Sequence, residues 1–288
     1  MTRLPDDALA AAAMAIREAD ALLITAGAGM GVDSGLPDFR GPSGFWQAYP
    51  AFDRLGLKFE DIANPAVFRS DAPLAWGFYA HRLHMYRSAY PHRGYGLLLQ
   101  WAAKKPAGYF VFTSNVDGHF HRAGFDEHRI TECHGSIHFV QCASPCHSDI
   151  WPADHLDLTV DPATCRAMGA LPACPQCDGI ARPNVLMFDD YTWLNQRTAE
   201  QWMDYRRWLT SLGGAKLAIV ELGAGRSIPT VRRESERVAA QHDGRLIRIN
   251  TQEPETPTGH VALRGGALEM LTQISKNMSG GRRATDNG

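Results

Sequence analysis

The sequence contains no apolar run that approaches the ~18 residues needed for a membrane-spanning helix. It also lacks a surplus of positive charge, because 29 Lys and Arg stand against 31 Asp and Glu and the formal net charge is −2. Proteins that bind nucleic acid by neutralising phosphates carry such a surplus, so direct nucleic-acid binding is not expected. Residues 1–20 are alanine-rich and acidic, unlike the basic start and apolar core of a secretory signal. We therefore expect a cytoplasmic protein without a membrane partner.

Cysteine is scarce, but four of the six cysteines form two close pairs. The pairs Cys142-x3-Cys146 and Cys174-x2-Cys177 have the spacing of zinc ribbons, in which each pair supplies two thiolates to a tetrahedral site. Four protein ligands leave no open position on the metal for water or substrate. The sequence thus predicts one structural zinc per chain.

Other arrangements of the cysteines stay open at this point. Two disulfides, or unrelated buried thiols, would also explain the pairs, although a reducing compartment disfavours disulfides. His147 follows Cys146 directly and could compete as a metal ligand. We expect the remaining two, Cys133 and Cys165, to be small buried apolar residues.

Glycine is concentrated in the most informative segment, residues 27–41, which read Gly-Ala-Gly-Met-Gly-Val-Asp-Ser-Gly-Leu-Pro-Asp-Phe-Arg-Gly. The segment follows an apolar run, residues 21–24, that is typical of a buried strand. Backbone N–H groups in a loop at the end of such a strand can bind a nucleotide phosphate. The generic dinucleotide motif needs a further glycine where this chain has Val32, and no acidic residue lies suitably about 20 residues on, so an ordinary dehydrogenase is disfavoured.

The Pro-Asp-Phe-Arg sequence that follows these glycines resembles the sirtuins, the NAD-dependent protein-lysine deacylases. Further segments are similar to that family in the expected order along the chain. They are Thr-Ser-Asn-Val-Asp at 113–117, Thr-Glu-Cys-His-Gly-Ser at 131–136, Arg-Pro-Asn-Val-Leu-Met-Phe at 182–188 and Ile-Arg-Ile-Asn at 247–250. The resemblance extends roughly over residues 20–274 and is to a divergent, bacterial-type member.

The fold class expected is α/β: a Rossmann-like doubly wound parallel sheet with a small zinc-binding module and a helical insertion. Apolar runs near residues 21–25, 109–113, 217–222 and 245–249 predict parallel strands that alternate with helices. Leu9, Ala13 and Ile16 recur at helical spacing and predict an N-terminal helix packed on the sheet. We expect the NAD-binding domain at residues 1–41, 96–139 and 183–278, the aromatic-rich helical insertion at 42–95, the zinc module at 140–182 and a disordered tail at 279–288.

The resemblance implies that His134 is the catalytic base. In the family's reaction, the bond between nicotinamide and ribose breaks, the acyl oxygen of a modified lysine attacks the ribose, and a base then draws a proton from a ribose hydroxyl. An imidazole titrates in the right range for that step. By the same resemblance Asn115 and Asp117 orient the ribose and the nicotinamide carboxamide. The nearby histidines lack the flanking Glu-x-His-Gly and are expected at the surface or core edge; they are His119, His121, His128 and His138.

The resemblance also implies a set of residues that bind NAD. Asp38 would seat the nicotinamide end, Phe39 would shield the cationic intermediate, and Arg40 would hold a diphosphate or ribose oxygen unless it forms a surface salt bridge. The full set is Gly27, Ala28, Gly29, Asp38, Phe39, Arg40, Ser114, Asn115, Asp117, Gly223, Ala224, Gly225 and Asn250.

Three departures from the family pattern put cofactor affinity and turnover in doubt. Gly31 stands where the family has serine, and Ser114 replaces a glutamine. The segment Gly-Ala-Gly-Arg at residues 223–226 replaces Gly-Thr-Ser-Leu, which removes two hydroxyl groups near the adenosine end.

The residues predicted to bind substrate are Tyr79, Arg82, Val185 and Phe188. A Tyr-x-x-Arg pair is similar to the one by which some sirtuins bind succinyl and other acidic acyl groups, and positions i and i+3 share one helix face. A core tyrosine beside a solvated arginine is the alternative. The expected partner is an acyl-lysine protein that adds a strand between the segment after Phe188 and the loop at Gly225. Asp189 and Asp190 in that segment either favour basic substrates or form a solvated turn.

Two other functions stay open from the sequence. An NAD glycohydrolase or ADP-ribosyltransferase would use the same ribose chemistry with another acceptor. A catalytically weak regulator would bind NAD or acyl-lysine without turnover. Neither the oligomeric state nor the protein substrate is indicated.

Overall fold

The computed structural model describes residues 6–38, 49, 53–54 and 56–280. Phe39 and Arg40, two of the residues predicted to bind the cofactor, lie outside these ranges. So does the expected tail from residue 281 onward, whereas residues 279 and 280 end the last helix. Among the described helices, none is long and apolar enough to cross a membrane.

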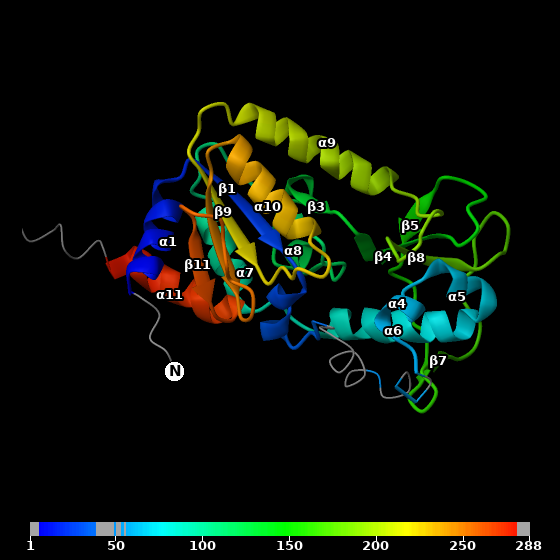
Figure 1. Ribbon diagram of the computed structural model, residues 1–288. Coiled ribbons are helices and arrows are strands. Elements are labelled where there is room, and N and C mark those ends of the chain that lie inside the picture. Colours follow the sequence, from blue (N-terminus) through cyan, green and yellow to red (C-terminus); the bar gives the residue numbers. More distant parts are fainter. Residues whose placement is uncertain (1–5, 39–48, 50–52, 55, 281–288) are drawn as a thin grey trace, which may run out of the picture.

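The larger part of the molecule is built on a six-stranded parallel sheet (Figure 1). Its strands lie in the order β11-β10-β9-β1-β2-β3. Their bounds are β1 Ala21–Ala26, β2 Tyr109–Thr113, β3 Ile130–Glu132, β9 Leu217–Leu222, β10 Arg245–Asn250 and β11 Val261–Arg264. The four strands predicted from apolar runs are confirmed to within one residue. Strands β1 and β9 are buried along their whole length, as expected for parallel strands with both faces covered.

Helices cover both faces of this sheet (Figure 1). On β1, Leu22 and Ile24 face one core with helices α1, α7 and α11, while Ala21 and Leu23 face the other with α9 and α10. The bounds are α1 Asp6–Glu18, α7 Arg93–Ala102, α8 His119–Arg122, α9 Gln196–Ser211, α10 Thr230–Gln241 and α11 Ala267–Gly280. The predicted N-terminal helix is confirmed, because Leu9, Ala13 and Ile16 are buried in the first core. We call the sheet and these helices the large lobe.

A small lobe lies beside the end of β3 (Figure 1). It combines an antiparallel sheet in the order β5-β4-β8, a two-stranded ribbon of β6 and β7, and helices α4 to α6. The bounds are α4 Phe59–Ile62, α5 Pro65–Ser70, α6 Ala72–Ser88, β4 Gly135–Cys142, β5 Ile150–Pro152, β6 Val160–Asp161, β7 Arg166–Ala167 and β8 Ala181–Val185. Strands β4 and β8 extend across the expected module boundaries at residues 140 and 182, because the two strands pair on both sides of these positions, with a register shift between Ser136 and Val140.

Helix α6 connects the two sheets of the small lobe. The Trp76 indole N–H donates to the Ala181 carbonyl at 2.8 Å, which ties the helix to β8. Gly77 faces the ribbon so closely that a Cβ there would lie 1.9 Å from the carbonyl oxygen of Cys165. Most of the aromatic residues of the insertion that the structure describes are core residues here, as predicted.

The chain order places a crossover point at the centre of the large sheet. From β1 the chain runs to β2 and β3 on one side, and it later returns to β9 on the other side of β1 and continues to β10 and β11. In open parallel sheets, ligands bind outside the carboxyl ends of the strands at such a point. The loops that follow β1, β2, β3, β9 and β10 meet at this edge.

A buried charge cluster joins the strands on the far side of β1. Arg248 on β10 donates to both carboxylate oxygens of Glu221 on β9, and its Nη2 lies 2.7 Å from Glu236 of α10. The side chains of Arg248 and Glu221 are 1% and 0% exposed. Removal of one member of such a cluster leaves an uncompensated buried charge.

We predict that Arg248→Met lowers the free energy of unfolding by about 3–5 kcal/mol, because Glu221 loses its buried partner. Arg207→Met is the matched control, since the Arg207 side chain is 77% exposed and pairs with Asp204 on the surface of α9; its effect should stay under about 1 kcal/mol. Urea denaturation of the three proteins measures both. Equal stability of the two variants would contradict a structural role for the cluster.

Candidate active site

Two glycine-containing loops touch at the crossover point. Gly27 and Gly29, directly after β1, lie against Gly223 and Ala224, directly after β9. The Gly29 N–H donates to the Gly223 carbonyl at 3.1 Å, and a Cβ on Gly27 would lie 2.8 Å from the Cα of Ala224. Gly223 has a φ of 59°, and a Cβ there would lie 2.4 Å from the backbone of Gly29. Only glycine permits this approach of the two loops.

Three backbone amides at this contact are not used by the described part of the chain. Among the described residues, the N–H groups of Ala28, Ala224 and Gly225 have no hydrogen-bond acceptor. Ala28 is exposed, and it begins the short 3₁₀ helix η1 (Ala28–Met30). Free amides at the end of a parallel strand are the groups that bind phosphate oxygens. The loops therefore fit the diphosphate of a dinucleotide.

The loop after β2 is held against the first glycine loop. The Asn115 side-chain amide donates to the Gly27 carbonyl at 3.0 Å, and Ser114 N–H donates to the Ala26 carbonyl at 3.1 Å. Thr113 links the two segments, since its hydroxyl donates to Ala26 and accepts from the Asn115 N–H. The sequence pattern gave no role to Thr113, whose hydroxyl fixes the position of Asn115.

Asn250 holds the second loop in the same way. Its side-chain amide donates to the Ala224 carbonyl at 2.8 Å, and its side-chain oxygen accepts from the N–H groups of Gln252 and Glu253. These three bonds occupy the side chain, which is 2% exposed. Asn250 therefore shapes the loop at Ala224 and Gly225 from behind.

A further residue that the sequence did not point to braces the first loop. The Nδ1 atom of His92 accepts from Gly94 N–H at 3.0 Å, so the ring proton lies on Nε2, which donates to the Met30 carbonyl at 3.0 Å. The His92 N–H also donates to the Ser34 hydroxyl. Because 62 positions separate His92 from Met30, only the fold reveals this contact.

Asp117 is a buried carboxyl at the end of the same segment as Asn115. It accepts a hydrogen bond from the His119 N–H at 2.8 Å, and its backbone carbonyl lies 2.9 Å from Nε2 of His138. Burial raises the pKa of the Asp117 carboxyl above its ordinary value. His119 is buried and His138 is half-buried. The expected position at the surface or core edge is therefore wrong for His119.

A cavity of about 660 Å³ lies against Asp117 and Gly118. Its other walls come from α9, β4 and the end of α6, including Tyr86 and Arg197. Neither the glycine loops nor His134 line it. Of the three predicted catalytic residues, Asp117 lines the cavity.

His134 lies between β3 and β4, at the edge where the loops meet. Its backbone carbonyl accepts from Leu186 N–H at 2.9 Å, which fixes the residue against the segment after β8. The next residue, Gly135, has a φ of 76°, and a Cβ there would lie 2.1 Å from the Asn184 carbonyl. Burial lowers the pKa of His134 below the ordinary 6.5, so its imidazole is neutral near neutral pH. A neutral imidazole is the form that can accept a proton.

Glu132 anchors His134 from the other side. It is buried, and its carboxylate pairs with Arg197 at 2.6 Å and lies 3.5 Å from Nε2 of His121. Its interactions with His121 and Arg197 lower the pKa of the Glu132 carboxyl against the effect of burial. The Thr198 hydroxyl donates to the Glu132 carbonyl, so α9 is bonded directly to the strand that carries His134.

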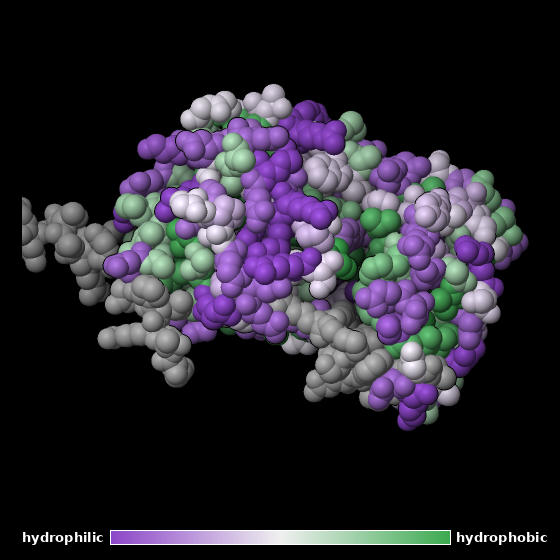
Figure 2. All heavy atoms as spheres, viewed as in Figure 1, coloured by the Kyte–Doolittle hydropathy of each residue, from purple (hydrophilic) through white to green (hydrophobic). Residues whose placement is uncertain are grey.

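The predicted substrate residues Val185 and Phe188 lie at the end of β8 and in the segment that follows it. Val185 pairs with Gly135 across the two strands, and it is buried. Phe188 is half-buried, its N–H donates to the Ala63 carbonyl at 2.9 Å, and its ring meets the Phe59 ring edge-on at 5.9 Å. Figure 2 shows a hollow between the two lobes, with apolar residues at its walls.

Asp190 does not take either role expected for it. Both of its carboxylate oxygens pair with Arg182 at 2.9 Å, and both side chains are 0% exposed. Asp190 also accepts from Thr192 and from the Met187 N–H. All of these partners lie within the protein, so the Asp190 carboxylate is not available to a substrate. Asp189 is exposed and could contact a basic substrate.

Tyr79 and Arg82 are buried side by side on α6, so the alternative of a solvated arginine is wrong. The Arg82 guanidinium donates from Nε and Nη2 to the Tyr86 hydroxyl at 3.0 and 2.7 Å. Its Cζ lies 5.8 Å from the Tyr79 ring centre and 5.9 Å from that of Phe59. Phe59 in turn contacts Phe188, which connects Arg82 to the segment beside His134.

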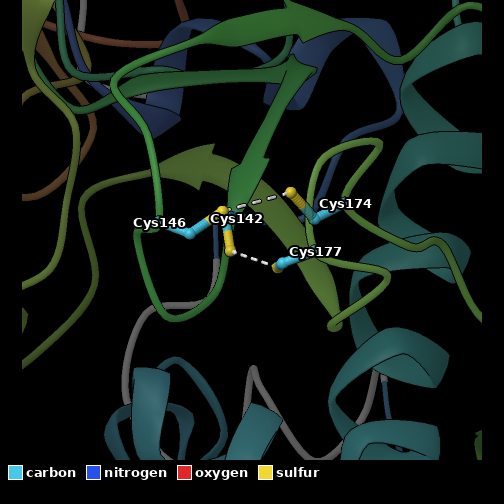
Figure 3. A group of neighbouring side chains, drawn as sticks. All are labelled: Cys142, Cys146, Cys174 and Cys177. Atoms are coloured by element: carbon cyan, nitrogen blue, oxygen red, sulfur yellow. Dashed lines mark hydrogen bonds between the residues drawn. The ribbon is translucent and has the colours of Figure 1, made fainter.

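The four predicted zinc ligands form one cluster in the small lobe (Figure 3). The sulfur atoms of Cys142 and Cys177 are 3.8 Å apart, and those of Cys146 and Cys174 are 3.7 Å apart. Sulfurs that bind one zinc at about 2.3 Å in a tetrahedron lie about 3.8 Å from each other, whereas a disulfide bond measures about 2.05 Å. The cluster is positioned to bind one structural zinc.

The other two cysteines are buried, as predicted. Burial raises the pKa of the Cys165 thiol to about 11, and it raises the pKa of Cys133 still further. Both groups are therefore thiols, not thiolates, near neutral pH.

Comparison with protein families gives a match to the Sir2 family over residues 27–208. The chain is 28% identical to NAD-dependent protein deacylase 1 of Archaeoglobus fulgidus, over 91% of this chain and 95% of that protein. It is 33% identical to the mitochondrial NAD-dependent protein deacylase sirtuin-5 of Danio rerio, over 66% of this chain and 63% of that protein.

Solved structures agree with the sequence matches. A serine-to-alanine mutant of a Sir2 homologue in complex with ADP-ribose superimposes with a TM-score of 0.69 at 25% identity and covers 99% of this chain and 100% of that chain. A histidine-to-asparagine mutant of a Sir2 homologue with ADP-ribose gives 0.68 at 26% identity, over 99% of each chain.

We predict that protein purified without added metal contains one zinc per chain, and that a strong chelator unfolds the β5-β4-β8 sheet. Structural zinc in such modules contributes on the order of 10 kcal/mol to folding. Elemental analysis and far-UV circular dichroism measure both effects. Cys174→Ala should lose the zinc and the control Cys165→Ala should keep it; zinc retained by Cys174→Ala would exclude the proposed ligand set.

Proposed function

Because this chain belongs to the Sir2 family, we propose that it is an NAD-dependent protein-lysine deacylase that transfers the acyl group to ADP-ribose and releases nicotinamide. One observation carries the proposal. A neutral histidine, His134, lies at the same sheet edge as two glycine loops whose free amides fit a diphosphate.

The residues divide the work as follows. NAD, when bound, supplies an activated ribose from which nicotinamide can leave. The amides of Ala28, Ala224 and Gly225 hold the diphosphate, and Asn115 and Asp117 orient the ribose and the carboxamide. His134 accepts the proton of a ribose hydroxyl at a ring nitrogen, since its lowered pKa keeps the ring neutral. Asp38, Phe39 and Arg40 complete the cofactor set, as the family resemblance implies.

The departures from the family pattern act on binding rather than on the base. A Cβ at Gly31 would lie 3.2 Å from the Leu36 side chain, so this position is already filled by packing. Ser114 contributes a backbone bond to Ala26, and no long amide reaches the ribose from it. We propose weaker cofactor binding with an intact proton transfer step.

An acyl-lysine protein is the proposed partner. The segment after β8 lies beside His134, and the substrate would add a strand between the segment after Phe188 and the loop at Gly225, so that its lysine enters the hollow between the lobes. Val185 and Phe188 supply the apolar wall along that path. The absence of direct nucleic-acid binding and the cytoplasmic location remain predictions.

We further propose a preference for acidic acyl groups. The Arg82 guanidinium is buried among aromatic rings, where a charge–charge contact is only weakly screened by water. The Tyr86 hydroxyl accepts hydrogen bonds from Nε and Nη2 of Arg82, which fixes the orientation of the guanidinium. The Tyr79 hydroxyl is buried and has no hydrogen-bond partner among the described residues, so it can complete a carboxylate site with Arg82.

The decisive experiment is NAD consumption with acetyl-, succinyl- and longer acyl-lysine peptides, followed by mass analysis of the products. O-acyl-ADP-ribose supports the deacylase. Free ADP-ribose would indicate a glycohydrolase, ADP-ribosylated protein a transferase, and no turnover a binding regulator.

We predict that His134→Ala keeps NAD binding and loses deacylation by at least about a hundredfold, because the base acts after the cofactor has bound. His128→Ala is the control, since the His128 side chain is 78% exposed. In the wild type, kcat/KM should fall as pH falls through a pKa below 6.5, where the imidazole becomes protonated. Near-normal turnover in folded His134→Ala would exclude this base.

We predict that Arg82→Met weakens deacylation of a succinyl-lysine peptide by roughly 2–4 kcal/mol in transition-state terms and leaves an acetyl-lysine peptide nearly unchanged. Only the succinyl group carries a carboxylate for the guanidinium. The control Arg69→Met removes an exposed arginine from α5 and should affect neither peptide. Equal losses on both peptides would make Arg82 structural, and a wild type inactive on succinyl-lysine would refute the preference.

A further inference from the structure

His147 lies beside the zinc cluster but is not one of its four cysteine ligands. It follows Cys146 in the chain, its side chain is 9% exposed, and its ring lies 5.8 Å from the Trp151 ring. Its Nε2 atom is 3.1 Å from the sulfur of Cys174. The contact has two possible explanations. His147 could be a metal ligand in place of one cysteine, or it could donate a hydrogen bond to the Cys174 thiolate.

The distance favours a hydrogen bond. With zinc bonds of about 2.05 Å to nitrogen and 2.3 Å to sulfur, two ligands at the tetrahedral angle lie about 3.5 Å apart. The Nε2 atom of His147 lies closer to Cys174 than that, whereas the two sulfur pairs match the edge of a four-sulfur tetrahedron. All four sulfurs lie within 4.8 Å of one another, which completes the ligand set without the imidazole.

The other ring nitrogen identifies the donor. The backbone N–H of Asp149 donates to Nδ1 of His147 at 3.0 Å, so in the neutral ring Nδ1 carries a lone pair and Nε2 carries the proton. The Asp149 carboxylate oxygen lies farther from Nδ1, at 3.3 Å, so the Asp149 N–H makes the shorter contact with this nitrogen.

We propose that His147 donates an Nε2–H hydrogen bond to the Cys174 thiolate and thereby holds the zinc more tightly, without binding the metal itself. Four thiolates give a zinc centre two excess negative charges, and an N–H donor reduces the charge on the sulfur that accepts it. Residues that hydrogen-bond metal ligands in this way typically change metal affinity by about 10–100-fold. The bond also lowers the reactivity of Cys174 toward electrophiles.

Among the described residues, an imidazole donor lies against Cys174 and not against the other three sulfurs. The sulfur of Cys142 has hydrogen bonds to the backbone of Ser144 and Cys146 instead, and Cys146 and Cys177 are exposed. Cys142 ends β4, the strand that begins directly after His134. Loss of the metal would therefore loosen the strand that positions the candidate base.

Zinc transfer to a chromogenic chelator tests the proposal on the full chain. Wild type is compared with His147→Leu, which has no donor, and His147→Gln, whose amide can donate from a similar position. His155→Leu is the control, an exposed histidine of the same module. We expect one zinc in every protein, about 10–100-fold weaker retention in His147→Leu, recovery in His147→Gln and no change in the control.

Two results would overturn the proposal. The first is an absorption spectrum of the cobalt-substituted wild type that is typical of three sulfur ligands and one nitrogen ligand and that changes in His147→Leu. Such a spectrum would show that His147 is a metal ligand. Zinc retention in His147→Leu equal to wild type would remove any effect of the bond. If His147→Leu does not fold, ring ¹H–¹⁵N correlations of the wild-type zinc protein decide, since the proposal requires a proton on Nε2.

Discussion

The contact between the two glycine loops is the constraint on which the candidate site depends. At the crossover point, Gly27 and Gly223 allow the backbones of the loops after β1 and β9 to come into direct contact. Any side chain at these positions would separate the loops and move their free amides apart. Asn115 and Asn250 then fix each loop by a hydrogen bond to a carbonyl, and the proposed diphosphate site is built on the backbone that these bonds hold in place.

The candidate base belongs to both lobes. His134 follows a strand of the large sheet, and Gly135 begins a strand of the small sheet. Its position therefore depends on Glu132, which α9 anchors, and on β8, which pairs with the strand that carries the first zinc ligand. We therefore expect the metal site of the small lobe to affect the position of the candidate base, which the cysteine cluster does not contact.

Buried charges serve different purposes in this chain. The Arg248 and Arg182 guanidinium groups are matched by carboxylates and hold elements together. Arg82 is surrounded by aromatic rings and donates to a tyrosine hydroxyl. Asp190 resembles a surface acid in the sequence, yet the turn after β8 places it against Arg182.

The sequence by itself determined the features that depend on local chemistry. Apolar runs located the strands, the Cys142-x3-Cys146 and Cys174-x2-Cys177 spacing located the metal cluster, and the motif around His134 located the candidate base. Contacts between distant segments were decided only by the tertiary structure: the brace from His92 to Met30, the burial of Asp190, and the bond from His147 to Cys174. The reason is physical. A residue type fixes what a group can donate or accept, but burial and partners come from segments that the chain order leaves far apart.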